Sequence, residues 1–199
     1  MKKALITVAA LLLMSAGVSA QVENPISLYV GGAISIPNSP EEFSEAYNTG
    51  FHGSVGLGLA VMPSLQVVGK VEYHRFGLDV TQDMEDMGVT GGHNNMWMYG
   101  ADARHSFGLP AAPIKPFLLG GVGFARISAS DLEGTGDLVA GLNELNPDAE
   151  TNLYLNLGGG VELKTGPMFS FFGQVRYVTV DTDGESSSFI PVTLGLKFF

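Results

Sequence analysis

The segment NLYLNLGGGVELK (Asn152–Lys164) alternates between apolar residues and small or polar ones. Successive side chains of a β-strand point to opposite faces, so the alternation predicts a strand with one apolar and one polar face. The apolar face holds Leu153, Leu155, Leu157, Val161 and Leu163, and the other holds Tyr154, Asn156, Gly158, Gly160 and Glu162. The fold then depends on how many such strands exist and on what each face meets.

Seven further segments are rich in Val, Leu, Phe and Tyr and are bounded by turn residues, which predicts an all-β protein. The 27 glycines also argue against a helical protein. Each segment is close to the ~9–11 residues that a tilted strand needs to cross a membrane. The eight predicted strands are Ile26–Ile34, Phe51–Val61, Leu65–Phe76, Met96–Phe107, Phe117–Ser128, Asn152–Lys164, Phe169–Val180 and Phe189–Phe199.

The connections between these strands alternate in length. Tight turns lie around Pro63, at residues 108–116 and at Thr165–Pro167, and the intervening connections are longer. This pattern predicts an eight-stranded antiparallel up-and-down transmembrane β-barrel with short periplasmic turns and long extracellular loops. An even number of strands would leave both termini in the periplasm.

The charged residues are divided between the two kinds of connection. The four long loops hold sixteen of the twenty Asp and Glu residues and no Lys or Arg. One end of the molecule is therefore predicted to be strongly acidic. With a formal net charge of −10, the chain is also a poor candidate for nucleic-acid binding.

The polar faces of the strands are predicted to line the inside of the barrel. They are rich in Gly, Ala and Ser, which suit a narrow lumen and would make a poor water-facing surface. We expect a lumen without a wide channel, filled by salt bridges among Lys70, Glu72, Asp102, Arg104, Glu162 and Arg176. In Phe117–Ser128, Arg126 shares its face with apolar residues, which predicts a bulge or glycine kink there. The alternative is a soluble, lipocalin-like barrel with its apolar face inside.

Aromatic residues gather near both ends of the predicted strands, as expected for girdles at the two membrane interfaces. The predicted girdle residues are Trp97, Tyr99, Phe107, Phe117, Phe169, Tyr177 and Phe198.

The first twenty residues, MKKALITVAALLLMSAGVSA, have the features of a secretory signal: two lysines, an apolar run and a small-x-small end. We expect residues 1–20 to be removed, leaving 21–199 as one barrel domain. The absence of cysteine excludes disulfides and a lipid-modified cysteine.

Several of these stretches of sequence resemble those of a known protein family. The signal, LYVGGA at 28–33, KPFLLGGVGFARI at 115–127, LNLGGGVELK at 155–164 and the terminal GLKFF together resemble the small eight-stranded outer-membrane barrels, the OmpA/OmpX-like and opacity-type "porin family" proteins. The resemblance implies location in the outer membrane of a Gram-negative bacterium and contact with its lipids and lipopolysaccharide. It also implies that Phe198 and Phe199 act as a signal to the β-barrel assembly machinery.

The sequence leaves the function open. A structural or surface-interaction role is favoured, and a narrow pore for small solutes or ions and a lipid-modifying enzyme are alternatives. No catalytic residue, cofactor or metal site is predicted. His105 and Ser106 are strand neighbours that point to opposite faces, whereas His52 and Ser54 share a face, as do Glu72 and His74. The acidic loops could bind an extracellular ligand or divalent cations, although DTDGE at 181–185 lacks the spacing of an EF-hand.

Two loop segments have helical character. Ser39 and Pro40 are a candidate N-cap and first helical residue ahead of FSEAY, and residues 136–145 form a second candidate. Both would shape the surface that the long loops present.

Overall fold

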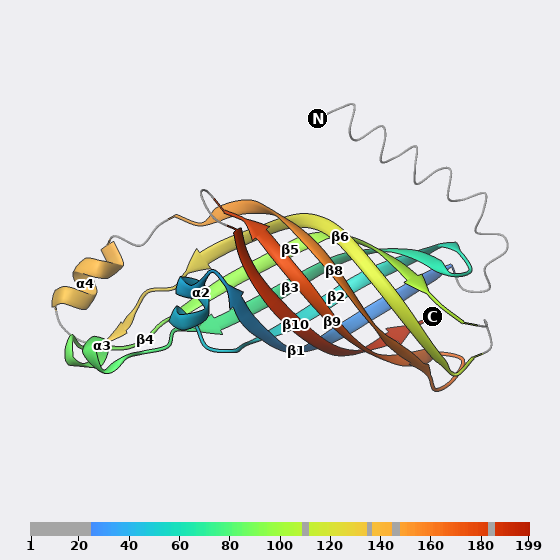
Figure 1. Ribbon diagram of the computed structural model, residues 1–199, viewed down its shortest axis with the longest axis horizontal. Coiled ribbons are helices and arrows are strands. Elements are labelled where there is room, and N and C mark those ends of the chain that lie inside the picture. Colours follow the sequence, from blue (N-terminus) through green and yellow to red (C-terminus); the bar gives the residue numbers. More distant parts are fainter. Residues whose placement is uncertain (1–24, 109–111, 135–136, 145–147, 183–185) are drawn as a thin grey trace, which may run out of the picture.

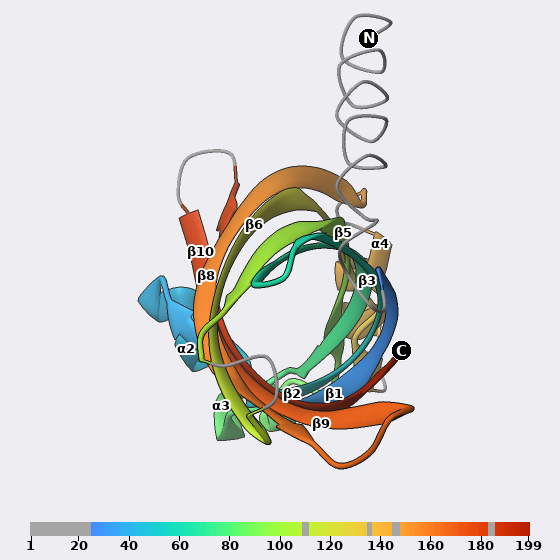
Figure 2. The same cartoon turned by 90° about the vertical axis from the view of Figure 1, so that its right-hand side faces the viewer.

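Eight strands close into one antiparallel barrel in the computed structural model (Figures 1 and 2). The structure describes residues 25–108, 112–134, 137–144, 148–182 and 186–199, so the predicted signal at 1–20 lies outside the described residues. The barrel strands are β1 (Ile26–Ser39), β2 (Gly50–Met62), β3 (Leu65–Gly77), β5 (His93–Ser106), β6 (Ile114–Ala129), β8 (Glu150–Lys164), β9 (Phe169–Asp181) and β10 (Ser186–Phe198). The predicted fold class is confirmed.

Each strand pairs with its sequence neighbour, and the first pairs with the last. Leu28 lies opposite Phe198 and Ile36 opposite Ile190, which closes the barrel and leaves it without an edge strand. The predicted strands are all present, but β1 continues five residues beyond Ile34. Residues up to Ser39 pair with β10, so the cross-strand hydrogen bonds extend the strand despite Pro37.

The long connections all lie at one end of the barrel, here called the loop end, and the tight turns lie at the other, the turn end (Figure 1). The loops carry the helices α2 (Glu41–Ala46), α3 (Gln82–Asp86) and α4 (Asp137–Glu144) and a two-stranded sheet of β4 (Val89–Gly91) and β7 (Glu133–Gly134). Among the described residues, no helix is long and apolar enough to cross a bilayer. The predicted start of α2 is shifted, because Pro40 rather than Ser39 is its N-cap and no side chain caps it.

The two faces of the strands have opposite polarity. Leu155 and Leu157 are 53% and 70% exposed on the outside, whereas Arg176 is 1% exposed in the lumen. A soluble barrel with an apolar interior would require the reverse, so the lipocalin-like alternative is wrong. The outer surface of this barrel suits hydrocarbon rather than water.

Strand β6 differs from the prediction. Its pairing with β5 and β8 runs without a register shift, so the expected bulge or kink is absent from the described strand. Arg126 accordingly points outwards beside Trp97 of β5 and Thr151 of β8, near the loop end. At this height a guanidinium lies near the edge of the apolar band, where an outward charge costs little compared with the middle of a bilayer.

Candidate functional site

The middle of the lumen is filled by a balanced cluster of charges. Arg176 of β9 donates two hydrogen bonds to Glu72 of β3, at 2.9 and 2.5 Å. Lys70 Nζ lies 3.2 Å from Glu72 Oε2 and 2.8 Å from Asp102 Oδ2. Asn156 donates to Asp102 at 2.9 Å. Two cations and two carboxylates from three strands therefore neutralise one another across the barrel.

A second charged cluster lies nearer the turn end. Arg104 Nη2 donates to Glu162 Oε2 at 2.9 Å, and Lys197 Nζ lies 3.3 Å from Glu162 Oε1. The guanidinium carbon of Arg104 is 3.5 Å from the ring centre of Phe117 and 5.6 Å from that of Phe172. All six charged residues predicted for the lumen thus face it, and Lys197 joins them. A cavity of about 40 Å³ separates the two clusters, enough for a few water molecules.

The prediction that Phe117 belongs to an aromatic girdle is wrong. Its side chain is 2% exposed and lies under Arg104 in the lumen. Phe117 shares the inward face of β6 with Leu119 and Ala125, so strand alternation, rather than closeness to a turn, decides its direction. The other predicted girdle residues are exposed on the outer surface: Trp97, Tyr99, Phe107, Phe169, Tyr177 and Phe198. Phe199 is also exposed, and its ring centre lies 4.7 Å from Lys197 Nζ.

Two histidines form a polar layer between the central charges and the loop end. His52 and His74 stack with ring centres 4.9 Å apart. Ser35 Oγ lies 3.1 Å from His52 Nδ1 and 2.8 Å from His74 Nδ1, and His52 Nε2 lies 3.0 Å from Thr193 Oγ1. Ser35, rather than the Ser54 considered from sequence, is the serine in contact with the histidines. Because all four side chains are buried, the layer packs the lumen and is closed to a lipid substrate.

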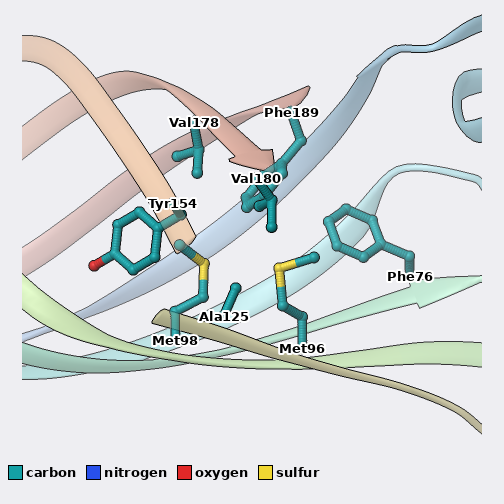
Figure 3. Close-up of a cluster of buried hydrophobic side chains, with 8 residues drawn as sticks. All are labelled: Phe76, Met96, Met98, Ala125, Tyr154, Val178, Val180 and Phe189. Atoms are coloured by element: carbon teal, nitrogen blue, oxygen red, sulfur yellow. The ribbon is translucent and has the colours of Figure 1, made fainter. Parts of the chain in front are cut away.

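A cluster of buried apolar side chains, here called the apolar plug, lies in the lumen toward the loop end (Figure 3). The buried cluster contains Phe76, Met96, Met98, Ala125, Tyr154, Val178, Val180 and Phe189. Phe43 and Tyr47 of the first long loop pack against it from outside. This plug was missed from sequence, although a signal existed: Met96 and Met98 share the face of Asp102, and Val178 and Val180 share that of Arg176.

Above the plug, the loops hold one another in place. Val89 of β4 pairs with Gly134 of β7, which joins the second long loop to the third. Asn143 of α4 accepts from the Leu132 amide at 2.7 Å and donates to its carbonyl at 3.1 Å. A cavity of about 150 Å³ lies beneath these contacts, lined by Tyr47, Leu78, Gly92, His93, Ala129, Ser130, Leu132 and Asn143. The loops are therefore linked to one another by hydrogen bonds and form a structured surface over the barrel.

The described residues contain no group of three or more His, Asp or Glu side chains that could hold a metal ion. His105 is exposed on the outer face of β5, whereas Arg104 beside it is buried in the lumen. A His–Ser pair is therefore not formed by the neighbours His105 and Ser106, in keeping with strand geometry.

Comparison with known proteins identifies the family. The model of the "Outer membrane protein beta-barrel domain" matches residues 6–198, almost the whole chain. Comparison with curated proteins gave no match.

Solved structures show the same architecture at low identity. Neisserial surface protein A (NspA) superposes with a TM-score of 0.63 at 18% identity, covering 88% of this chain and 97% of that one. Ail, the attachment invasion locus protein of Yersinia pestis, solved with the heparin analogue sucrose octasulfate, gives 0.53 at 13% identity, covering 87% and 96%. OprG of Pseudomonas aeruginosa gives 0.51 at 8% identity, covering 86% and 94%. These likenesses show a shared fold.

Proposed function

The chain belongs to the outer membrane protein β-barrel domain family, and from that premise we propose that it is a closed barrel that presents an interaction surface. The observation that carries this proposal is the double closure of the lumen. Salt-bridged side chains fill its middle, and the apolar plug formed around Phe76 and Phe189 covers its loop end. A barrel closed in this way suits a structural or surface role better than the alternative of a narrow pore.

Conductance across a planar bilayer tests the closure. The refolded protein should give no steady single-channel openings in symmetric salt, while an open porin in the same membrane serves as the positive control. Steady openings of uniform size would instead support the narrow pore for ions or small solutes.

We propose that the loop end faces the outside and the turn end the periplasm, with the C-terminus periplasmic. Loops with several helices and an internal sheet suit the exterior, where function on a rigid scaffold usually lies. Because the chain has no cysteine, single cysteines can report the orientation. In intact cells, a membrane-impermeant maleimide should label Glu144→Cys and spare Thr165→Cys until the outer membrane is permeabilised. The opposite labelling would invert the proposed orientation.

The loop surface is proposed to bind a cationic partner, either divalent cations or a basic protein segment. The described loops carry carboxylates and no Lys or Arg, and those of α2 and α3 are Glu41, Glu42, Glu45, Asp83, Glu85 and Asp86. The Ail structure holds a polyanion, and these acidic loops would repel such a ligand. Calorimetric titration with calcium, at constant ionic strength, tests binding of divalent cations. Comparing the affinities of lysine-rich and glutamate-rich peptides tests binding of a basic protein segment. Stronger binding of the acidic peptides would contradict the proposal.

At the outer rim we propose contact with the phosphate groups of outer-leaflet lipids, including lipopolysaccharide. Arg126 projects from β6 beside Trp97, and Arg75 projects from β3 on the same side of the barrel. None of the salt bridges among the described residues includes Arg126. An unpaired guanidinium beside an interfacial tryptophan is suited to a lipid phosphate, since Arg binds phosphate in a bidentate manner.

We also propose that the protein is not an enzyme acting on lipids. Among the described residues, the contacts of a serine with a histidine ring are those of Ser35, and they are buried in the lumen, away from the outer surface that lipids reach. Ser130 contacts the backbone of His93 and not its ring. Incubation with lipopolysaccharide followed by mass analysis of lipid A should show an unchanged profile. Loss of an acyl chain or headgroup would support the enzyme instead.

A further inference from the structure

The charges at the turn end of the lumen are unbalanced. Arg104 and Lys197 are both buried, yet they share the single carboxylate of Glu162. In the central cluster, by contrast, Lys70 and Arg176 face two carboxylates. Among the described residues, the turn-end cluster therefore carries one buried positive charge more than its carboxylate neutralises, which is costly.

Two more lysines increase the imbalance. Lys115 shares the inward face of β6 and pairs with Glu162 of β8. Lys164 follows at the end of β8 on the same face as Glu162. The positive charge of Lys197 is repelled by Arg104 and Lys115 and attracted by Glu162. Among the described residues, no other Asp or Glu lies at the turn end.

A buried hydroxyl without a partner lies between two of these lysines. Ser170 of β9 pairs with Lys164 on one side and Lys197 on the other, and it is fully buried. Directly opposed residues have Cβ atoms about 5 Å apart, so both long lysine side chains can reach an ion beside Ser170. Within the part of the chain that the structure describes, neither Ser170 Oγ nor Arg104 Nε has a hydrogen-bond partner. Buried polar atoms are normally satisfied, so both atoms are available to donate to an acceptor oxygen.

We propose that the turn end of the lumen is an oxyanion site that takes a phosphate group. Lys115, Lys164 and Lys197 supply ammonium donors, Ser170 a hydroxyl and Arg104 a guanidinium. Among the described residues, these four cations face the side-chain carboxylate of Glu162 alone, and such a surplus suits a dianion better than chloride or a monocarboxylate. Phosphate also offers several acceptor oxygens to the donors. The ligand enters from the turn end, because the apolar plug and acidic loops close the other end to an anion.

Calorimetric titration tests the site on the full barrel, folded in zwitterionic detergent at constant ionic strength, with inorganic phosphate as the probe. Phosphate should bind saturably with a stoichiometry of about one, and acetate more weakly. Lys115→Gln/Lys164→Gln should weaken phosphate at least about tenfold, because two charge-assisted contacts are lost. Both lysines lie at the rim of the lumen, so the variant keeps its fold, which the faster migration of the unboiled protein on electrophoresis reports.

The matched control is Lys115→Arg/Lys164→Arg, which keeps both positive charges at the turn end and should retain phosphate binding. No saturable binding of phosphate to the folded protein, or an equal loss in both double variants, would overturn the site. Phosphatidylglycerol added to the micelles separates two sources of the same chemistry. Competition with inorganic phosphate assigns the site to a lipid headgroup, and an unchanged affinity assigns it to a soluble phosphate compound.

Discussion

The guanidinium of Arg176 donates two hydrogen bonds, at 2.9 and 2.5 Å, to the carboxylate of Glu72 across the middle of the lumen. The two residues come from strands β9 and β3, which are not neighbours in the sheet. The pair therefore braces opposite walls of the barrel as well as filling its interior. Since both side chains are at most 2% exposed, neither charge can be satisfied by bulk water if its partner is removed.

Glu72→Gln should destabilise the folded barrel by about 3–5 kcal/mol, because it leaves Arg176 buried without its charge partner. Urea unfolding in lipid vesicles, followed by the fluorescence of the single Trp97, measures the change. Glu144→Gln, which removes the same charge from exposed α4, should change stability by less than about 0.5 kcal/mol. Glu72→Leu/Arg176→Met should recover part of the loss. Equal stability of Glu72→Gln and Glu144→Gln would show that the buried pair is dispensable.

The fold could be predicted because the alternation of apolar and polar residues along each strand shows which side chains face the lumen and which face outwards. Leu155 and Arg176 follow that alternation, and the narrow lumen then brings the inward charges together. The prediction for Phe117 was wrong because its place near a turn was given more weight than the face of the strand on which it lies. Arg126 was misjudged because the expectation that charges avoid the lipid face weakens near the interface, where an outward arginine is tolerated.

A charge on the outer face should be costly only in the middle of the barrel wall. Leu157→Lys, near the centre of β8, should destabilise by about 2–4 kcal/mol, whereas Leu163→Lys, at the turn end of the same strand, should cost about 0–1 kcal/mol. Both leucines are exposed on the outer surface, so the comparison isolates depth in the bilayer. Unfolding in vesicles measures both, and equal costs would contradict a bilayer around this face.

Gly121 leaves room for the central charge cluster. A Cβ at this position would meet the carboxylate of Asp102 and come within 2.9 Å of Asn156 Nδ2. Gly121→Ala should therefore displace the Asp102–Asn156 pair and cost about 1–3 kcal/mol. Gly69→Ala is the control, since its Cβ would meet nothing within 4 Å on the outer face of β3, and it should change stability by less than about 0.5 kcal/mol. If Gly121→Ala left the stability unchanged, the charge cluster would be able to rearrange around the added methyl group, against this prediction.

Arg126 should hold anionic lipid at the outer rim. Arg126→Gln should reduce the lipopolysaccharide that copurifies with the barrel, whereas Arg126→Lys, which keeps the charge and loses the bidentate geometry, should reduce it less. Mass spectrometry of bound lipid A, per mole of protein, gives the ratio. His105→Gln, on the outer face at the turn end, is the control and should leave the ratio unchanged. If Arg126→Gln retained lipopolysaccharide at the wild-type ratio, Arg126 would not be a lipid contact.

The parts of the site that escaped prediction depend on distances between segments far apart in sequence. Ser35 meets His74 only because β1 and β3 flank β2 in the closed barrel. The apolar plug likewise brings Phe76, Met96, Val180 and Phe189 together from four strands. Alternation indicates that each of these side chains points inwards. It gives no register between strands, and register decides which inward residues share a layer.

The lumen should have two closures in series, each sufficient alone. Phe76→Ala/Phe189→Ala removes large side chains from the apolar plug, but the salt bridges around Glu72 still fill the middle, so this variant should remain non-conducting. Glu72→Gln, with the plug intact, should also remain closed. Conductance from Phe76→Ala/Phe189→Ala alone would mean that the charged cluster is permeable and that the plug is the sole barrier.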